Sequence, residues 1–272
     1  MTAPLLRLEG VSKRYSAETG WLTALENVAL EIGRGEFVSV IGPSGCGKST
    51  LLNIIAGLIP DYEGRVEING QRISGPHPAI AVVFQEESTF EWRSALRNVS
   101  FGLEMQGLPR SDWEPRARDV LRLVGLSDFA NSYPSQLSGG MRQRVAIARA
   151  LVLEPDLLLM DEPFGALDEQ TRLLLGEELL RIQAELGQTI FFVTHNIQEA
   201  VYLSDRVAVM SARPGRIKRA FEVALPRPRS ADIIASHRFG ELVGEMWASL
   251  RSEALEGLQQ AEQASRTAAH IS

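Results

Sequence analysis

Cysteine is almost absent from this sequence of 272 residues, in which Cys46 is the single example. One thiol cannot form a disulfide within its own chain, and structural disulfides are typical of oxidising compartments. We therefore expect a reducing compartment, with the cytoplasm as the default.

Long hydrophobic runs are also missing. The longest apolar stretches, such as Leu157 to Met160 and Ile190 to Val193, are far shorter than the roughly 20 residues that cross a bilayer as a helix. Near the N-terminus, Glu9 follows a very short apolar run, unlike the charged-then-apolar order of a secretory signal. The sequence predicts neither export nor a chain that forms a channel by itself.

Positive charge is in deficit, with 28 Lys and Arg residues against 34 Asp and Glu residues. Non-specific nucleic-acid binding usually needs an overall basic field, so nucleic acid is not an expected partner. The hydrophobic fraction of 44% is enough for a full core, and the length permits one large domain or two small ones. The fold class must therefore come from patterns along the chain.

Short apolar runs bounded by Gly and Pro alternate with stretches of helical periodicity, which predicts an α/β fold with a largely parallel sheet. The runs typical of buried strands are Phe37 to Ile41, Ala81 to Phe84, Leu157 to Met160, Ile190 to Thr194 and Val207 to Met210. Between Ala95 and Ala150 such runs vanish. Helix-like stretches at 96–105, 112–124 and 139–151 replace them and indicate an inserted helical subdomain at about residues 90–152.

The segment 225–230, LPRPRS, carries two prolines and is interpreted as a linker that ends a first domain, residues 1–225. In residues 226–272, apolar side chains recur at spacings of one, three or four, the pattern of an amphipathic helix. They are Phe239, Leu242, Val243, Met246, Trp247, Leu250, Ala254 and Leu258. We expect this helix to pack on its own domain, and contact with a dimer mate or another partner is the alternative.

A run of nine residues matches the P-loop pattern G-x-x-x-x-G-K-[ST], directly after the apolar run FVSVI and within the start of the helical run STLLNIIAGL. The nine are Gly42, Pro43, Ser44, Gly45, Cys46, Gly47, Lys48, Ser49 and Thr50. In this motif backbone N–H groups surround the phosphates of a nucleotide such as ATP, and the helix N-terminus favours negative charge. Lys48 is predicted to reach the β- and γ-phosphates, and Ser49 to bind Mg²⁺.

Two carboxylates, Asp161 and Glu162, follow the apolar run LLLM. Folds with parallel sheets bind ligands at the carboxyl edge, so Asp161 is predicted to hold Mg²⁺ beside the P-loop. Glu162 points differently because it is the next residue along a strand, and its carboxylate can act as a general base or orient the attacking water. A solvated strand end is the alternative for an isolated Asp-Glu pair. The accompanying P-loop favours the catalytic interpretation.

The stretch LSGGM places Ser138 before Gly139 and Gly140 at the start of a helical run. Ser138 is a natural N-cap, and a helix N-terminus with exposed N–H groups can hold an anion. Capping alone would explain the serine. Two adjacent glycines favour the close approach of another group, for which a phosphate is a good candidate.

These motifs, in this order, resemble those of ABC-transporter nucleotide-binding subunits over about residues 6–221. The resemblance implies a P-loop NTPase of the ABC type, with a RecA-like core sheet, an antiparallel N-terminal β-subdomain and the inserted helical subdomain. It also implies a head-to-tail dimer with a second ABC subunit, in which Ser138, Gly139 and Gly140 of one chain contact the ATP on the P-loop of the other. Transmembrane permease subunits and an extracytoplasmic solute-binding protein would select the cargo, with this chain peripheral at the cytoplasmic face of the membrane.

Some positions take their expected roles from the resemblance alone. Gln85, after the run AVVF, corresponds to a glutamine that touches Mg²⁺ and senses the membrane subunit, and Asp168, in GALD, lies at the dimer seam. His195, after IFFVT, corresponds to a histidine that contacts the γ-phosphate. For the aromatic side chain that stacks on adenine, Tyr15 is the first choice and Trp21 the second.

The form SGGMRQR is similar to sequences of nitrate, sulfonate and taurine importers and of oligopeptide importers. The compact length, the run DEPFGALD and the short helical tail favour the first group. The expected contact with the membrane subunits is the stretch Glu86 to Val99, in which Phe90 and Trp92 flank a polar loop. Burial of these aromatic residues beneath the helical subdomain is the alternative.

The expected reaction is ATP hydrolysis coupled to closure of the dimer. Lys48, Mg²⁺ and the opposing signature helix neutralise the phosphates, while Glu162 and His195 position the attacking water. A soluble ABC ATPase acting on nucleic acid or the ribosome is the alternative, but such proteins usually have long insertions or two fused cassettes. A metabolic P-loop kinase would need an acceptor-binding lid in place of Ser-Gly-Gly, and Glu162 and His195 argue against a non-catalytic cassette.

Overall fold

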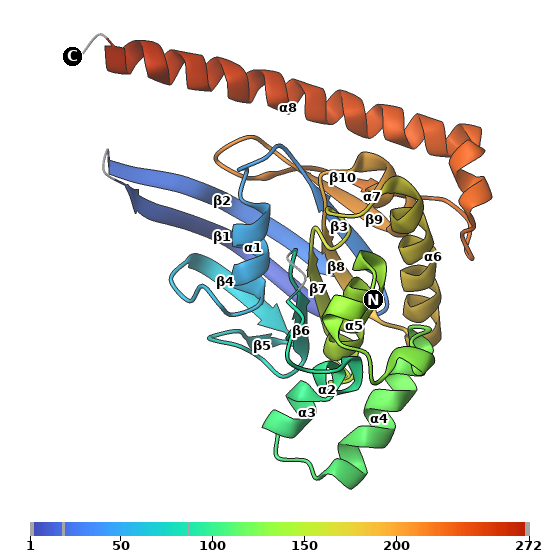
Figure 1. Ribbon diagram of the computed structural model, residues 1–272. Coiled ribbons are helices and arrows are strands. Elements are labelled where there is room, and N and C mark those ends of the chain that lie inside the picture. The colour runs from blue at the N-terminus through green and yellow to red at the C-terminus, as the bar shows by residue number, and fades with distance from the viewer. Residues whose placement is uncertain (1–2, 18–19, 86–87, 270–272) are drawn as a thin grey trace.

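The structure is a computed structural model that describes residues 3–17, 20–85 and 88–269, of which 254–269 are described as helix backbone only. Its centre is a six-stranded sheet with the order β10-β9-β3-β8-β7-β6, parallel throughout except for the antiparallel pair β9 and β10 (Figure 1). The strands are β3 (Phe37–Ile41), β6 (Ile80–Val83), β7 (Leu157–Asp161), β8 (Thr189–Val193), β9 (Arg206–Met210) and β10 (Ile217–Glu222). The first five of these match the predicted runs to within one residue at each end.

A second, antiparallel sheet is formed mainly by the N-terminal part of the chain, with the order β2-β1-β4-β5. Its strands are β1 (Leu6–Ala17), β2 (Gly20–Ile32), β4 (Glu63–Ile68) and β5 (Gln71–Arg72). The pairing of β1 with β2 shifts register three times between Leu8 and Arg14, and Gly10 has a φ of 60°. These bulges bend the long hairpin, whose far end reaches the P-loop.

The central sheet divides the core into two hydrophobic clusters. Along β3, Phe37 and Ile41 pack into one cluster, whereas Val38 and Val40 pack into the other. Side chains alternate between the faces of a strand, so a strand with apolar residues throughout contributes to both clusters. The first cluster includes the helical subdomain, and the second lies between the central sheet and the N-terminal sheet.

The helices cover both faces of the sheet and include the expected insertion. They are α1 (Lys48–Ile55), α2 (Ala95–Val99), α3 (Phe101–Met105), α4 (Arg110–Leu123), α5 (Gly139–Leu151), α6 (Glu169–Leu186), α7 (Ile197–Leu203) and α8 (His237–Ala269), with short 3₁₀ turns η1 (Ser127–Phe129), η2 (Pro134–Gln136) and η3 (Ala231–Ala235). The elements α2 to α5 lie within the range predicted for the helical subdomain. The predicted stretch 96–105 consists of two short helices, separated at Ser100. In Figure 1, α3 and α4 lie at the opposite end of the molecule from α8.

The segment 225–230, which was predicted to be a linker, lies between β10 and η3 and is fixed to the core. Arg229 is only 7% exposed, and its guanidinium donates to the carbonyl oxygens of Tyr202 at 2.9 Å and Ser204 at 2.7 Å. A cation at the C-terminal end of a helix stabilises the last carbonyl groups, here those of α7.

The amphipathic helix α8 packs on its own domain along its first half. Phe239, Leu242 and Met246 are buried in the first hydrophobic cluster, whereas Trp247 is 62% exposed. Helix α8 contacts α7, η3 and β9. The side chains of Ala254 and Leu258, which belong to the predicted stripe, lie outside the described residues.

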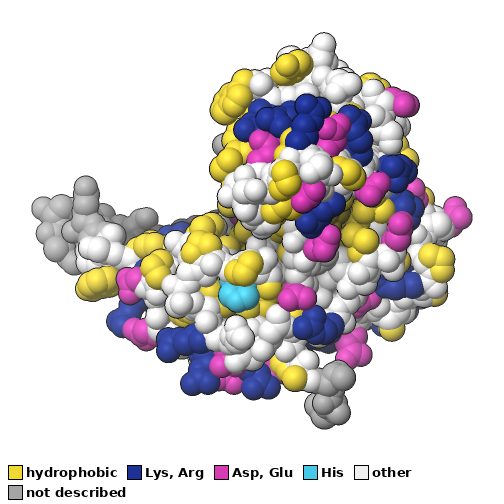
Figure 2. Space-filling view, turned by 90° about the horizontal axis from the view of Figure 1, so that it is seen from below, with side chains coloured by type: hydrophobic (Ala, Val, Ile, Leu, Met, Phe, Trp, Pro, Cys, Tyr) yellow, Lys and Arg dark blue, Asp and Glu magenta, His cyan; other side chains and the backbone are white. Residues whose placement is uncertain are grey.

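The surface carries charges of both signs close together. Figure 2 shows Lys and Arg side chains interspersed with Asp and Glu over one face of the molecule. On α6, for example, Arg181 pairs with Glu178 at 2.7 Å and with Glu185 at 2.8 Å. This mixed face agrees with the near balance of acidic and basic residues in the sequence.

Candidate nucleotide-binding site

The P-loop, residues 42–50, connects the carboxyl end of β3 to α1 and needs glycine for steric reasons. Gly47 has a φ of 104°, and a Cβ atom there would lie 2.8 Å from Leu25 Cδ2 and 3.0 Å from the carbonyl oxygen of Ala24. A Cβ atom on Gly42 would lie 2.8 Å from Cys46 Sγ. Glycine therefore lets the loop pack closely against β2 at Gly47 and against its own Cys46 at Gly42.

Lys48 places an ammonium group inside the loop. It is 6% exposed, and its Nζ donates to the carbonyl oxygens of Gly42 at 3.0 Å and Pro43 at 3.2 Å. These acceptors carry no formal charge, so the positive charge of Lys48 is available to an anion that enters the loop. Cys46 is buried nearby, and burial raises the pKa of its thiol, which therefore stays neutral at pH 7.

The carboxylates Asp161 and Glu162 lie where β7 ends. Asp161 is largely buried, and this burial raises the pKa of its carboxyl group, while a hydrogen bond from Ser49 and the charge of Lys48 act in the opposite direction. Its Oδ1 atom is buried without a hydrogen-bond partner. Glu162 adopts a left-handed φ of 44°, and its backbone N–H donates to the carbonyl oxygen of Val193 at 2.8 Å. The chain therefore turns sharply at Glu162.

His195 meets Glu162 across the ends of neighbouring parallel strands. Asp161 of β7 is paired with Val193 of β8, and the next residues place His195 Nδ1 2.9 Å from Glu162 Oε2. Thr194 fixes the turn between β8 and α7, because its hydroxyl group accepts the backbone N–H of Asn196 at 3.0 Å. The pair is a carboxylate and an imidazole at the carboxyl edge of the sheet, the arrangement that can orient and deprotonate a water molecule.

A pocket of about 410 Å³ lies over the P-loop. It is lined by Tyr15, Leu22, Ala24, Ser44, Gly45, Gly47, Lys48, Ser49, Thr50, Glu162 and Arg213. Tyr15 is the residue predicted to stack on adenine, and it reaches this pocket from β1. Trp21, the second choice, lines a different hollow together with Lys13 and Asp61. The geometry thus favours Tyr15.

The residues beside the P-loop fit a magnesium ion. Mg²⁺ prefers oxygen ligands and usually binds through one or two carboxylates together with substrate phosphates and water. Asp161 offers a buried, unpartnered oxygen, and the hydroxyl group of Ser49 lies beside it. Within the described residues, no cluster of three His, Cys, Asp or Glu side chains could form a complete metal cage. A metal here would therefore depend on the phosphates of the nucleotide for further ligands.

The Ser-Gly-Gly sequence lies at the start of α5. Helix capping explains Ser138, and close packing explains Gly140. Ser138 Oγ accepts the backbone N–H of Met141 at 3.3 Å. A Cβ atom on Gly140 would lie 2.9 Å from Thr171 Cγ2, so the group that approaches this glycine within the chain is a side chain of α6. Thr171 in turn donates to Asp168 from its backbone N–H at 2.9 Å and from its hydroxyl group at 2.7 Å, which lowers the pKa of Asp168.

The single chain does not bring every predicted residue to the pocket. Gly42, Pro43, Cys46, Asp161 and His195 are absent from the lining, although Asp161 adjoins Ser49 and His195 adjoins Glu162, both of which line the pocket. In the part of the chain that the structure describes, the lining also excludes Gln85, Ser138, Gly139, Gly140 and Asp168. Gln85 follows β6, whose partner β7 carries Asp161, and it is exposed at the same edge of the sheet. The other four residues belong to the turns that begin α5 and α6.

The loop after Gln85 presents aromatic side chains on a rigid support. Trp92 is 74% exposed, and its ring centroid lies 5.4 Å from that of the half-buried Phe90. The buried side chain of Asn98 accepts the backbone N–H of Phe90 at 2.7 Å and donates to the carbonyl oxygens of Phe90, Arg93 and Ser94. Glu86 and Glu87, at the start of the predicted contact surface, lie outside the described residues.

A comparison of the sequence with known families decides the identity of the fold. The ABC transporter family matches residues 25–165, which include the P-loop and the Asp161-Glu162 pair. The chain belongs to the ABC transporter family. Its relatives extend the match over most of the chain.

Three relatives of this ABC chain have similar lengths. It is 47% identical to an uncharacterized ABC transporter ATP-binding protein of Methanocaldococcus jannaschii, over 93% of this chain and 94% of that protein. It is 49% identical to the aliphatic sulfonates import ATP-binding protein SsuB of Bacillus cereus, over 81% and 86% of the two chains. It is 45% identical to the taurine import ATP-binding protein TauB of Rhizobium johnstonii, over 91% and 97%.

Solved structures of ABC cassettes share the fold. One is a dimeric post-hydrolysis state of an ATP-binding cassette bound to ADP and Pi, with a TM-score of 0.70 and 35% identity over 81% of this chain and 100% of that one. Another is cbiO1 of Clostridium perfringens, part of an ABC transporter complex, with a TM-score of 0.73 and 30% identity over 82% and 90%. The predicted fold, the likeness to the sulfonate and taurine import branch and the enzyme class of ABC-type ATPase are confirmed.

The described helices of this ABC chain were also compared with the requirements of a membrane span. Among them, none combines the length and the apolar content needed to cross a bilayer.

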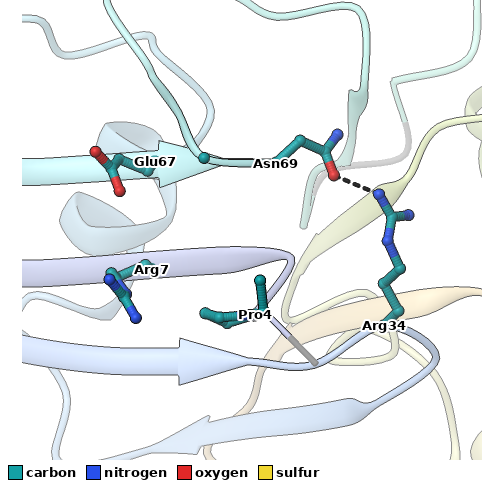
Figure 3. A pocket seen from close by; sticks show the side chains of 7 residues that line it. Pro4, Arg7, Arg34, Glu67 and Asn69 are labelled. Carbon is teal, nitrogen blue, oxygen red and sulfur yellow. Dashed lines mark hydrogen bonds between the residues drawn. The ribbon is translucent and has the colours of Figure 1, made fainter. Parts of the chain in front are cut away.

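A second hollow of the ABC chain lies against the N-terminal sheet, lined in part by Arg7, Arg34 and Asn69 (Figure 3). Its two cations already have partners. Arg7 pairs with Glu31 at 2.8 Å, and Arg34 donates to Asn69 and pairs with Asp156 at 3.2 Å. This hollow is therefore less suited to an anion than the pocket that contains Lys48.

Three residues of the nucleotide pocket were not predicted from the sequence. Leu22 and Ala24 lie on β2, and Arg213 lies in the loop between β9 and β10. The alternation of β2 could have indicated which of its residues share a face with Leu22. Nothing in the sequence near Arg213 connects it to a P-loop that is more than 160 residues away.

Proposed function

We propose that this ABC chain hydrolyses ATP to drive import of a small anion of the nitrate, sulfonate or taurine type through separate membrane permease subunits. The observation that carries the proposal is the convergence of Lys48, Asp161 and the Glu162–His195 pair at the carboxyl edge of one sheet. The names of the sulfonate and taurine relatives support the class of cargo.

The residues in and beside the pocket would have separate roles in binding and hydrolysis. Lys48 would neutralise the β- and γ-phosphates, and Tyr15 would stack on the adenine ring. Ser49, Asp161 and Gln85 would hold Mg²⁺, which supplies further positive charge to the phosphates when it is bound. Glu162, held by His195, would orient the attacking water and accept its proton.

The position of Ser138, Gly139, Gly140 and Asp168 outside the pocket lining, at the starts of α5 and α6, supports a site shared by two chains. Ser138 to Gly140 would close over the nucleotide bound by a second copy, with Asp168 at the seam. A related cassette forms a dimer when bound to ADP and Pi, which supports an assembly of two chains. The exposed Trp92 and its neighbour Phe90 would contact the permease, and the chain would then lie at the cytoplasmic face of the membrane. An extracytoplasmic solute-binding protein would deliver the anion.

The proposal can be tested with the complex purified from its native membranes. Its co-purifying permease and binding proteins would be identified, and uptake of taurine, alkanesulfonates and nitrate into vesicles would be measured with internal ATP. We expect Lys48→Ala to lower the affinity for ATP by at least about tenfold, because a hydrogen bond to a charged group contributes roughly 1.5–3 kcal/mol.

Lys218→Ala is the matched control, since Lys218 lies on β10, pairs with Glu253 of α8 and is not part of the pocket lining. It should retain both ATP hydrolysis and uptake. Normal ATP hydrolysis by Lys48→Ala would refute the assignment of the site. Stimulation of hydrolysis by nucleic acid or ribosomes, with no membrane partner, would instead favour a non-transport ABC ATPase.

A further inference from the structure

Arg213 is a cation at the mouth of the nucleotide pocket. Its exposed side chain lines the same pocket as Tyr15, Lys48 and Glu162. Its Nε and Nη2 atoms donate to the carbonyl oxygen of Gly45 at 3.3 Å and 3.0 Å. The guanidinium group therefore touches the P-loop itself.

The loop that carries Arg213 is held in a closed turn. Ser211 and Arg216 are joined by a hydrogen bond of 2.9 Å from the backbone N–H of Ser211 to the carbonyl oxygen of Arg216. The hydroxyl group of Ser211 accepts the backbone N–H of Arg216 at 2.9 Å and donates to the carbonyl oxygen of Pro214 at 2.7 Å. Arg213 thus projects from a base with little freedom to move.

The same turn is wedged between β2 and the P-loop. The backbone N–H of Gly215 donates to the carbonyl oxygen of Ala24 at 2.9 Å, and its carbonyl oxygen accepts the N–H of Glu26 at 3.0 Å. A Cβ atom on Gly215 would lie 2.1 Å from the carbonyl oxygen of Cys46, so the backbones approach as closely as glycine permits. The position of Arg213 relative to the phosphate-binding loop is therefore fixed from two sides.

The charge of Arg213 is not neutralised by the contact with Gly45, because a carbonyl oxygen has no formal charge. A guanidinium group has five N–H donors, and only those on Nε and Nη2 point at Gly45. Arg216, in the same turn, differs because it pairs with Glu26 at 2.6 Å. Among the described residues, no carboxylate forms an ion pair with Arg213.

We propose that Arg213 is a nucleotide-binding residue that holds the Gly45 carbonyl group and gives its charge to the phosphates of the bound nucleotide. The inference rests on the proposed function, in which this pocket binds ATP. Planar guanidinium groups are well suited to phosphate oxygens. The charge of Arg213 would strengthen the binding of nucleoside di- and triphosphates, whereas it would not change the affinity for an uncharged nucleoside.

The test compares variants that separate charge from hydrogen bonding. Arg213→Gln removes the charge but keeps a donor for the Gly45 carbonyl oxygen, and Arg213→Lys keeps the charge. Arg216→Gln is the matched control, since it removes a neighbouring charge that is already paired. Binding of ATP, ADP and adenosine would be measured by calorimetry at two salt concentrations, and melting temperatures would verify that each variant is folded.

We expect Arg213→Gln to bind ATP and ADP about tenfold more weakly, to bind adenosine unchanged, and to show a smaller salt dependence. Arg213→Lys should lose less affinity than Arg213→Gln, because it retains a point charge that binds phosphate. Wild-type affinity of Arg213→Gln for ATP, or an equal loss for adenosine, would overturn the inference and leave the proposed function intact. Failure of the wild-type chain to bind ATP at all would overturn the proposed function instead.

Discussion

Replacing Glu162 by Gln separates nucleotide binding from hydrolysis. The substitution keeps the size and hydrogen-bonding capacity of the side chain but removes its negative charge and its ready acceptance of a proton. Glu162 Oε2 lies 2.9 Å from His195 Nδ1, and an amide can partner the imidazole as donor or acceptor. The backbone bond from Glu162 to Val193 is unaffected. We therefore expect the local fold to survive.

The structure indicates how much free energy Glu162→Gln removes from folding and how much from catalysis. The side chain of His195 is 58% exposed, and even a fully charged surface pair contributes only about 0.2–1 kcal/mol, so the contact with Glu162 adds little to stability. A positioned general base contributes roughly 10²–10⁴-fold to the rate, which is about 2.7–5.4 kcal/mol of activation free energy. The catalytic loss is the larger, so hydrolysis should fall by roughly 10²-fold or more while ATP still binds.

The assay combines phosphate release with light scattering in the presence of Mg-ATP. Unhydrolysed ATP should hold two Glu162→Gln chains together through the P-loop of one and Ser138 to Gly140 of the other, so the dimer should accumulate. Adding Ser138→Arg should prevent this, because a bulky side chain would occupy the space of the opposing γ-phosphate. Glu185→Gln, which removes the carboxylate of the exposed ion pair with Arg181, is the control for a change of charge.

Two results would contradict this reasoning in different ways. Normal hydrolysis by Glu162→Gln would remove Glu162 from the catalytic residues. A variant that binds ATP but stays monomeric, even with the membrane subunits present, would exclude the shared site and leave the catalytic role in place.

Two further changes test the permease contact and the metal site. Trp92→Glu should reduce transport strongly while basal ATP hydrolysis continues, as measured in vesicles and with the isolated chain; unfolding of the isolated chain would show that Trp92 supports the core. Asp161→Asn should abolish Mg²⁺-dependent hydrolysis but raise the melting temperature of the nucleotide-free chain. Burial raises the pKa of Asp161 in the folded state, so the folded chain binds its proton more tightly and loses stability as pH rises. The gain in melting temperature should therefore shrink as pH is lowered, and a pH-independent gain would contradict this cause.

The central sheet was predictable because its strands are continuous apolar runs buried on both faces. The apolar run Phe37 to Ile41 is too short for a helix and is followed directly by the P-loop, so the sequence alone indicated a strand. Strand β1 was not, since the register shifts between Leu8 and Arg14 interrupt the alternation that marks a half-buried strand. Its antiparallel sheet was expected only through the resemblance to ABC subunits.

Site residues were predictable where they belong to one sequence motif or lie at the ends of neighbouring parallel strands. The contact between Glu162 and His195 follows once β7 and β8 are parallel neighbours, because equivalent ends then meet. The close approach at Gly140 was attributed to a phosphate, yet within the chain the group that meets it is Thr171 of α6. Packing between distant helices leaves no local pattern, and neither does the contact of Arg213 with Gly45.

The hydrogen bonds of Asn98 have a mechanical consequence for the loop that carries Trp92. A flexible loop would have to be ordered when a partner docks, which costs conformational entropy for each residue that is fixed. Here the side chain of Asn98 already joins the two ends of the loop, at Phe90 and at Ser94. A force applied to Trp92 would therefore be transmitted to α2, on which Asn98 lies, rather than absorbed by bending of the loop.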